Sequence, residues 1–368
     1  MKIKKKILLI TSEFPPQPGG IGQHAYNLAY HLSLTEEVMV LADQRSSDGK
    51  EEDEFDAQQN FQVKRIPRYA ILFLTYIQRM IIALQFAGKS DVVLVSGKFS
   101  LWQGGLIRLL KHQPIIAIIH GTEVLLANKQ LKKLTHRCLQ CFDHVIAVSH
   151  YTLDLVKHLA LKRTSVIPNG IQLKHEPTAK AKATKEVQLI TVGNLTQRKG
   201  QHNVIQALPQ LVKKYPELKY HCVGIPTNKD ELENIAGRLK VQAHIKFHGR
   251  VSYKEKERLL QQADIFMMLS ERTYSGDVEG FGIAILEANQ FGTPAVGSEK
   301  SGIEDAIKDG YSGLLVDSHD QEAIVQAIDK ILNDYEHYSY QATRWMRKFE
   351  WKNIVPQYEK VIDHLFEK

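Results

Sequence analysis

Short apolar runs recur along this sequence in two series, and each run leads through a turn into a segment with helical periodicity. Uninterrupted apolar runs bounded by turns are typical of parallel strands that helices cover on both faces. The stretch 174–186, KHEPTAKAKATKE, is polar and has no apolar period, as expected of a tether. We therefore predict an α/β fold with two domains, residues 1–173 and 187–344, joined by a linker at 174–186.

The size and charge of the chain narrow the class of protein. Its 368 residues fit two domains, and 43% hydrophobic with 24% charged residues is a globular composition. Residues 1–173 hold 21 Lys and Arg against 14 Asp and Glu, a net charge of +7 that equals that of the whole chain. This bias suits an anionic lipid or an anionic acceptor, and a solvated basic face is the alternative. Because no basic motif is interleaved with aromatic residues, we predict no nucleic-acid partner.

The apolar stretch 69–87 is about long enough to cross a membrane, but Arg79 stands at its centre. We predict instead a helix packed on a sheet, with an exposed part that can contact the surface of an anionic membrane. The apolar run at 7–10 is too short for a secretory signal. We expect a cytoplasmic protein that is at most peripheral on the inner face of the membrane.

Residues 277–294, DVEGFGIAILEANQFGTP, combine two glutamates with a glycine pair and a helical pattern. Gly280 and Gly282 let the backbone approach a ligand closely, and the helix that follows directs free N–H groups at the same place. Glu279 lies just before this helix and Glu287 lies inside it. The segment predicts an anion site flanked by two carboxylates.

A glycine loop, SEFPPQPGGIG at 12–22, follows the first strand pattern. Gly20, Gly22 and Ala25 satisfy the G-x-G-x-x-A pattern of a dinucleotide site, and Asp43 stands where such a site keeps its ribose-binding acid. An NAD-dependent oxidoreductase is therefore an alternative. Three prolines, however, separate the glycines from the strand, whereas a dinucleotide site places its first glycine almost directly after the strand.

Two further places are candidates for binding or chemistry. His120 ends the strand pattern PIIAIIH, and ligands of open α/β sheets lie beyond the carboxyl ends of strands. Arg198 and Lys199 stand just before a helical pattern that begins near Gln201. Two cations beside a helix N-terminus suit a diphosphate.

Together these segments resemble the retaining glycosyltransferases of family 4, which have the GT-B fold. The resemblance rests on the two glutamates of 277–294 with Gly-Phe-Gly and Glu-Ala after them, the His-Gly at 120–121, and the Ile-Pro-Asn-Gly at 167–170. The approach to Glu279 is most similar to the phosphatidylinositol mannosyltransferase branch. The resemblance to family 4 implies two Rossmann-like domains with parallel sheets facing across a cleft. It also implies a last helix, about 345–368, that packs back on the first domain.

The resemblance also implies roles for single residues. Glu279 would bind hydroxyls of the donor sugar, Glu287 the ribose, and Arg198 with Lys199 the diphosphate, while His120 would lie near the anomeric carbon. The family keeps an arginine where this chain has Asn194. The implied catalytic residues are His120, Glu279, Arg198 and Lys199. The implied donor-binding residues are Gly19, Gly20, Asn194, Arg250, Val251, Phe281, Gly282, Ile283 and Glu287.

We therefore predict a retaining, metal-independent glycosyltransferase that moves a sugar from a GDP- or UDP-sugar to the hydroxyl of a sugar or lipid-linked acceptor. Synthesis of cell-surface polysaccharide or glycolipid is the expected setting. The nucleotide sugar is a substrate, so no cofactor is expected, and no D-x-D metal motif occurs. Besides the oxidoreductase, the alternatives are a nucleotide-sugar 2-epimerase of the same fold and a catalytically silent binding subunit.

Overall fold

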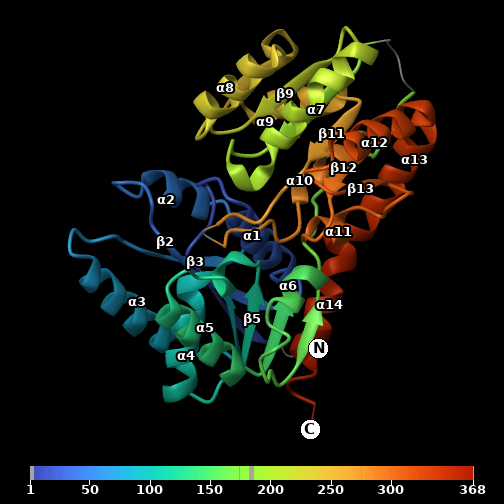
Figure 1. The fold of residues 1–368 in the computed structure, drawn as a ribbon. Coiled ribbons are helices and arrows are strands. Elements are labelled where there is room, and N and C mark those ends of the chain that lie inside the picture. The colour runs from blue at the N-terminus through green and yellow to red at the C-terminus, as the bar shows by residue number, and fades with distance from the viewer. Residues whose placement is uncertain (1–3, 174, 182–185, 275, 368) are drawn as a thin grey trace. The chain divides into compact units, whose positions relative to one another are not determined.

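The computed structural model describes residues 4–173, 175–181, 186–274 and 276–367, and the chain divides into two units (Figure 1). The first unit combines Met1–Gln172 with Trp351–Lys368, and the second spans Leu173–Glu350. Lys174 and residues 182–185 of the expected tether lie outside the described residues.

A parallel sheet of seven strands, in the order β3-β2-β1-β4-β5-β6-β7, forms the centre of the first unit. The strands in its middle are buried almost throughout, which explains why they carry no alternation of polar residues. The strands are β1 (Lys6–Thr11), β2 (Glu37–Asp43), β3 (Gln62–Ile66), β4 (Val92–Ser96), β5 (Ile115–Ile119), β6 (His144–Ala147) and β7 (Thr164–Val166). The helices are α1 (Gly20–Leu32), α2 (Lys50–Asp56), α3 (Leu72–Ala87), α4 (Lys98–Leu110), η1 (Thr122–Val124), α5 (Lys129–Cys141), α6 (His150–Asp154) and α14 (Trp351–Asp363).

The second unit has a parallel sheet of six strands in the order β10-β9-β8-β11-β12-β13. Its strands are β8 (Gln188–Val192), β9 (Lys219–Val223), β10 (Ile245–Gly249), β11 (Ile265–Met268), β12 (Ala295–Ser298) and β13 (Gly313–Val316). Its helices are η2 (Gln197–Lys199), α7 (Gln201–Lys214), α8 (Lys229–Leu239), η3 (Gln242–His244), α9 (Tyr253–Gln262), α10 (Ile283–Asn289), α11 (Ile303–Ala306), α12 (Gln321–Asn333), α13 (Tyr335–Met346) and η4 (Arg347–Phe349). The predicted α/β class with two parallel sheets is confirmed.

Both sheets have a point at which the chain order reverses, between β1 and β4 in the first and between β8 and β11 in the second. Ligands of doubly wound sheets bind outside the carboxyl ends of the strands at such a point. In the first unit the glycine loop follows β1, and His120 directly follows β5, the neighbour of β4. In the second unit Arg198 and Lys199 follow β8, and Glu279 follows β11.

The C-terminal helix α14 belongs to the first unit. Its first residue, Trp351, is buried, and the backbone amide of Trp351 donates to the carbonyl of Ile171 at 3.3 Å. A Cβ atom on Gly170 would lie only 2.5 Å from the Trp351 ring, so only a glycine lets the chain pass this close to the indole.

Helix α3 confirms the prediction of a helix over much of residues 69–87. Ala83 and Ala87 are buried in the core of the first unit. The charge at its centre, Arg79, is buried too, and it pairs with Asp43 at the end of β2 at 3.1 Å. No helix in the described part of the chain is long and apolar enough to cross a membrane.

The other side of α3 is apolar and exposed. Phe73 exposes 68% of its surface and Ile81 exposes 52%, which is unusual for apolar side chains on one helix. Among the side chains that the structure describes, this helix and the segment leading into it expose the large apolar residues Tyr69, Ile71, Phe73, Leu74, Tyr76, Ile77 and Ile81. We call them the α3 apolar face.

Candidate functional site

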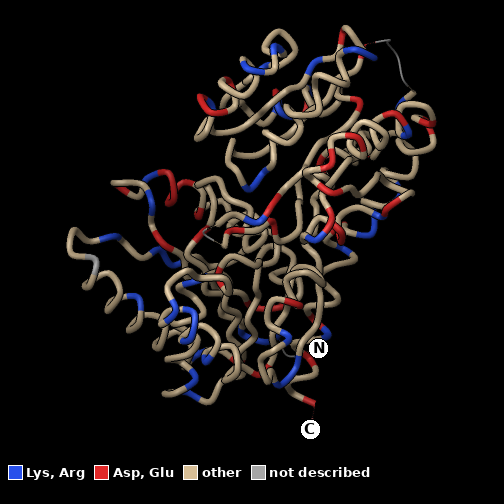
Figure 2. The backbone as a smooth tube through the Cα atoms, in the orientation of Figure 1, with Lys and Arg blue, Asp and Glu red and all other residues tan. Residues whose placement is uncertain are grey.

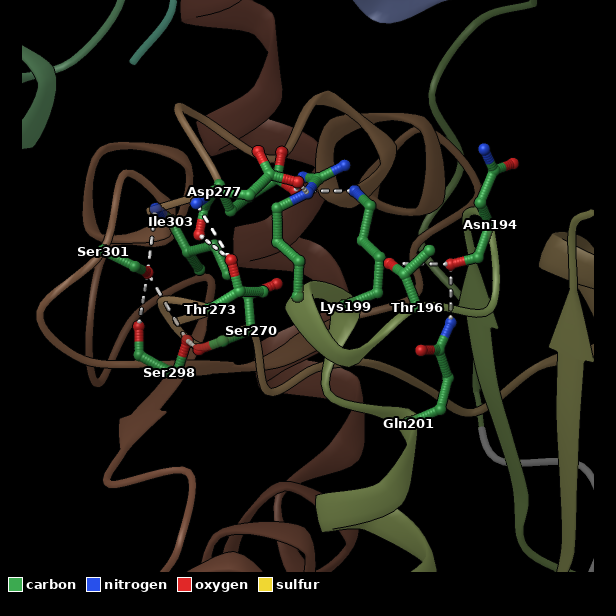
Figure 3. A network of polar contacts seen from close by, with 12 residues as sticks. Asn194, Thr196, Lys199, Gln201, Ser270, Thr273, Asp277, Ser298, Ser301 and Ile303 are labelled. Atoms are coloured by element: carbon green, nitrogen blue, oxygen red, sulfur yellow. Dashed lines mark hydrogen bonds and ion pairs between the residues drawn. The ribbon is translucent and has the colours of Figure 1, made fainter. Parts of the chain in front are cut away.

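A cluster of charged side chains gathers at the switch point of the second unit. The Lys199 ammonium lies 2.7 Å from Oε2 of Glu279, and Nη1 of Arg198 donates to the same oxygen. Nε of Arg198 also lies 3.1 Å from a carboxylate oxygen of Asp277 (Figure 3). We call these four residues the donor cluster.

The local backbone explains how Arg198 and Lys199 reach Glu279. Gly200 adopts a positive φ of 71°, and a Cβ atom there would lie 1.7 Å from the carbonyl oxygen of Leu269. A glycine is therefore required to join the short helix η2 to α7 against the end of β11. On the other side, Oγ1 of Thr273 accepts from the amide of Asp277 at 2.9 Å and holds the residue that pairs with Arg198 (Figure 3).

The electrostatics of the donor cluster keep Glu279 ionised. Burial alone would raise the pKa of its carboxyl, but Lys199, Arg198 and a hydrogen bond from the Gly282 amide outweigh burial and lower that pKa. Two cations thus converge on one carboxylate oxygen. An arriving diphosphate offers the same kind of acceptor with more charge, so the cluster can exchange one partner for another.

Glu287 of α10 has an ion-pair partner that the sequence did not indicate. The ammonium of Lys256 on α9 lies 2.9 Å from its Oε1 and 4.9 Å from the centre of the Tyr253 ring. Lysines on an amphipathic helix usually serve as solvated surface charge, so nothing in the sequence pattern singles out Lys256.

The other expected donor-binding residues of the second unit lie near the donor cluster in sequence or after β10, which is two strands from β8 in the sheet. The side chain of Asn194 is exposed and stands apart from the Lys199 ammonium, while its carbonyl accepts from Gln201 at 3.3 Å (Figure 3). Arg250 and Val251 follow β10. Phe281 is buried against Phe349, Gly282 has a φ of 88°, and Ile283 opens α10. The structure thus collects Arg198, Lys199 and Glu279 directly, and Asn194 brings no charge to them.

In the first unit, His120 is almost fully buried at the end of β5. Its Nε2 lies 2.9 Å from the Oγ atom of Ser96, the last residue of β4. Burial lowers the pKa of His120 to about 4, so the ring is neutral at neutral pH. The sequence did not indicate Ser96, although its place at the end of a switch-point strand could have done so.

Glu123, three residues after His120, is a second buried ionisable group. Its Oε1 accepts from the backbone amide of His120 at 2.5 Å, and its Oε2 has no hydrogen-bond partner among the described residues. Burial raises the pKa of this carboxyl to about 7; hydrogen bonds from backbone amides oppose the rise and the neighbouring Glu13 adds to it.

A cavity of about 400 Å³ opens in the first unit beside these residues. Its charged lining consists of three carboxylates and four cations, which are Glu13, Asp43, Glu123, Arg45, Arg68, Arg79 and Lys98. The glycine loop passes close by: a Cβ atom on Gly19 would lie 2.7 Å from the carboxylate of Glu13, whereas Gly20 has open space around it.

Among the described residues no cluster of His, Cys, Asp and Glu could hold a metal ion.

Comparisons with known proteins show the family to which the chain belongs. The model of the family "Glycosyltransferase Family 4" matches residues 18–175, and the model "Glycosyl transferases group 1" matches residues 174–345. The chain is a member of glycosyltransferase family 4. Family 4 enzymes are retaining hexosyltransferases that use nucleotide sugars, so the oxidoreductase and the silent binding subunit are set aside.

Relatives of the chain include mannosyltransferases. The chain is 29% identical over 350 residues to a GDP-mannose-dependent α-(1-6)-phosphatidylinositol monomannoside mannosyltransferase of Mycolicibacterium smegmatis, covering 89% of each. Among solved structures, sucrose-phosphate synthase from Thermosynechococcus elongatus has a TM-score of 0.80 at 19% identity over 99% of each chain. HepE from Anabaena, in complex with UDP and glucose, has a TM-score of 0.77 at 18% identity over 98% of this chain and 100% of HepE. These likenesses bear out the GT-B fold.

Proposed function

We propose that this family 4 enzyme transfers a sugar, with retention, from a GDP- or UDP-sugar to a hydroxyl of a lipid-linked acceptor in glycolipid or cell-surface polysaccharide synthesis. The observation that carries the proposal is the donor cluster, in which Arg198 and Lys199 converge on one oxygen of Glu279. Two cations at the switch point of a parallel sheet suit the diphosphate of a nucleotide sugar.

The donor cluster suggests how the donor is bound. The diphosphate takes the place of the Glu279 oxygen on Arg198 and Lys199, and the released carboxylate accepts hydrogen bonds from hydroxyls of the sugar. Fixed cations then stabilise the charge that develops on the leaving diphosphate. Glu287, oriented by Lys256 at 2.9 Å, accepts from the ribose.

The neutral state of His120 supports a same-face displacement. The bond between the anomeric carbon and the β-phosphate oxygen breaks, the acceptor oxygen bonds to that carbon on the same face, and its proton passes to the leaving phosphate. With a pKa of about 4 the His120 ring is a weak base and takes no proton in this scheme; it positions the sugar and stabilises positive charge at the anomeric carbon.

The first unit supports an anionic, membrane-bound acceptor. The cavity beside Glu123 is lined by four cations and by three carboxylates, so the cations are in excess by one. The α3 apolar face supplies exposed apolar side chains, and Lys129, Lys132, Lys133 and Arg137 make α5 strongly basic (Figure 2). An apolar surface near basic residues suits the surface of an anionic membrane.

The donor half of the proposal is tested with a panel of nucleotide sugars. Release of UDP or GDP is followed in the presence of vesicles of phosphatidylcholine with phosphatidylinositol. We expect one nucleotide sugar to be consumed, and we expect Lys199→Ala to lower the rate about 100-fold. Lys229→Ala removes an exposed lysine that pairs with Glu233 and lies over the Phe247 ring, and it serves as the matched control. Equal rates in both variants would contradict the assignment.

The acceptor half is tested by binding to the same vesicles. Replacing Phe73 and Ile77 by serine removes apolar area from the α3 apolar face without touching its buried side. We expect this variant to sediment with the vesicles several-fold less than the wild type, because vesicle binding scales with apolar area. Leu34→Ser removes an exposed leucine outside α3 and is the control. Vesicle binding by the double variant equal to that of the wild type would contradict the proposed membrane contact of the α3 apolar face.

A further inference from the structure

His24 on α1 lies inside the first unit, against His120. It is 1% exposed, and its ring centre is 5.2 Å from that of His120, with the two planes nearly perpendicular at 78°. Its Nε2 lies 3.1 Å from the hydroxyl oxygen of Tyr358, which is fully buried on α14 and 334 residues away in sequence. The last helix of the chain therefore bonds to the side chain that packs on His120.

The polar groups around His24 are only partly satisfied. Its Nδ1 has no partner within the described part of the chain. If Nε2 donates to Tyr358, Nδ1 keeps a bare lone pair; if the hydroxyl donates to Nε2, Nδ1 carries an unpaired N–H. An apolar ring at this place would bury no such group. A histidine here therefore calls for a reason beyond packing.

His120 is held from two sides. Its Nε2 lies 2.9 Å from the Ser96 hydroxyl, and the His24 ring packs across it. His24 in turn is fixed by its hydrogen bond to Tyr358 and by the indole of Trp351, whose ring centre is 5.6 Å away. Displacement of a catalytic side chain by a fraction of an ångström can cost much of the rate, so a ring held on two sides is suited to catalysis.

We propose that His24 is a positioning residue for His120 and that Tyr358 fixes His24 in this role. The C-terminal helix α14 thereby sets the ring plane of His120. The inference rests on the proposed role of His120 in the transfer reaction, and its test separates the two.

The variant Tyr358→Phe deletes one oxygen atom and keeps the packing of the ring. We expect kcat to fall about tenfold while KM for the donor stays unchanged, because the donor cluster is untouched. Tyr220→Phe is the matched control: Tyr220 is also fully buried, and its hydroxyl lies 2.7 Å from Thr191 in the core of the second unit. Thermal unfolding of both variants shows that each is folded at the assay temperature.

Two further measurements distinguish positioning from general destabilisation. In protein labelled with ¹⁵N-histidine, the ring-nitrogen resonances of His120 shift in Tyr358→Phe and stay in place in Tyr220→Phe. His24→Phe lowers kcat as Tyr358→Phe does, and the double variant is no slower than either single variant because both act through one contact.

The inference is overturned if Tyr358→Phe retains the kcat of Tyr220→Phe, if the His120 resonances do not move, or if the two single effects multiply. His120→Ala, assayed alongside, separates the two failures. Full activity in His120→Ala overturns the role of His120 and the inference with it. Loss of activity there, with full activity in Tyr358→Phe, overturns the inference alone.

Discussion

Arg198, Lys199 and Glu279 of the second unit are charged side chains that hold one another, whereas His24 and His120 of the first unit are neutral rings held by hydroxyl groups. The physical cause differs as well. Opposite charges outweigh burial and lower the pKa of Glu279, while burial alone lowers the pKa of His120 to about 4. A charged cluster can exchange its partners for a charged ligand, and a neutral cluster keeps its geometry when the ligand arrives.

The largest effect is expected from Glu279→Gln, which keeps the shape of the side chain and removes its charge. Arg198 and Lys199 then lose their shared carboxylate, and the sugar hydroxyls lose an ionised acceptor. We expect initial rates of nucleoside diphosphate release to fall about 10²- to 10³-fold. Glu255→Gln, which removes an exposed partner of Arg258, is the control. A rate close to that of the control would show that the donor cluster is structural.

The second largest effect is expected at His120, one of the two neutral rings of the first unit. We expect His120→Ala to lower kcat about 100-fold with little change in KM for the donor, since the donor cluster lies on other strands. Steady-state kinetics with the donor from the panel measure both constants. If KM rises and kcat is kept, His120 contributes binding and not transition-state stabilisation.

Much of this comparison follows from sequence. Arg198, Lys199 and Glu279 meet because β8 and β11 are neighbours at a switch point and parallel strands bring their carboxyl ends to one edge. Strand patterns and glycine loops predicted two separate anion sites, and the resemblance to family 4 assigned both to one donor. His120 was predicted for the same reason, from its place directly after an apolar strand.

The partners of these residues could not be predicted in the same way. Tyr358 reaches His24 only because α14 joins the first unit, and no local pattern links residues 334 positions apart. Ser96 and Lys256 are common residue types in common places, and only the folded chain shows what they contact. Pattern reasoning finds the strand ends; side-chain pairing across elements depends on tertiary packing.

A smaller effect is expected for Glu123, on the pH dependence of the stability of the protein. The direction of this pH dependence is opposite to that expected for His120. The folded pKa of Glu123, about 7, lies above the ordinary value of 4.5, so between these pH values the folded state binds a proton that the unfolded state lacks. This contribution is present below pH 4.5 and is lost as the pH rises through 7. The lowered pKa of His120 has the opposite effect on stability. Between pH 6.5 and about pH 4, stability is lost as the pH falls, because the unfolded state binds a proton that the folded state lacks.

The variant Glu123→Gln separates the contribution of the Glu123 carboxyl to pH-dependent stability from the contribution of the histidines. Its free energy of unfolding, relative to wild type, should rise by about 2 kcal/mol between pH 5 and pH 8, because the amide is never charged. Urea unfolding at the two pH values measures this. If the difference in free energy of unfolding between the variant and the wild type were the same at both pH values, Glu123 would have an ordinary pKa in the folded protein.

The smallest effect is expected at Lys256, the ion-pair partner of Glu287, for which we propose a contact with the ribose of the donor. Lys256→Ala leaves Glu287 without its partner at 2.9 Å, but Glu287 is partly exposed and water can solvate it. We therefore expect KM for the nucleotide sugar to rise several-fold, at most about tenfold, with kcat nearly unchanged, because the ribose is remote from the breaking bond. Lys254→Ala, on the same helix, is the control. A fall in kcat with unchanged KM would place Lys256 in the chemical step and extend the charged cluster to α9.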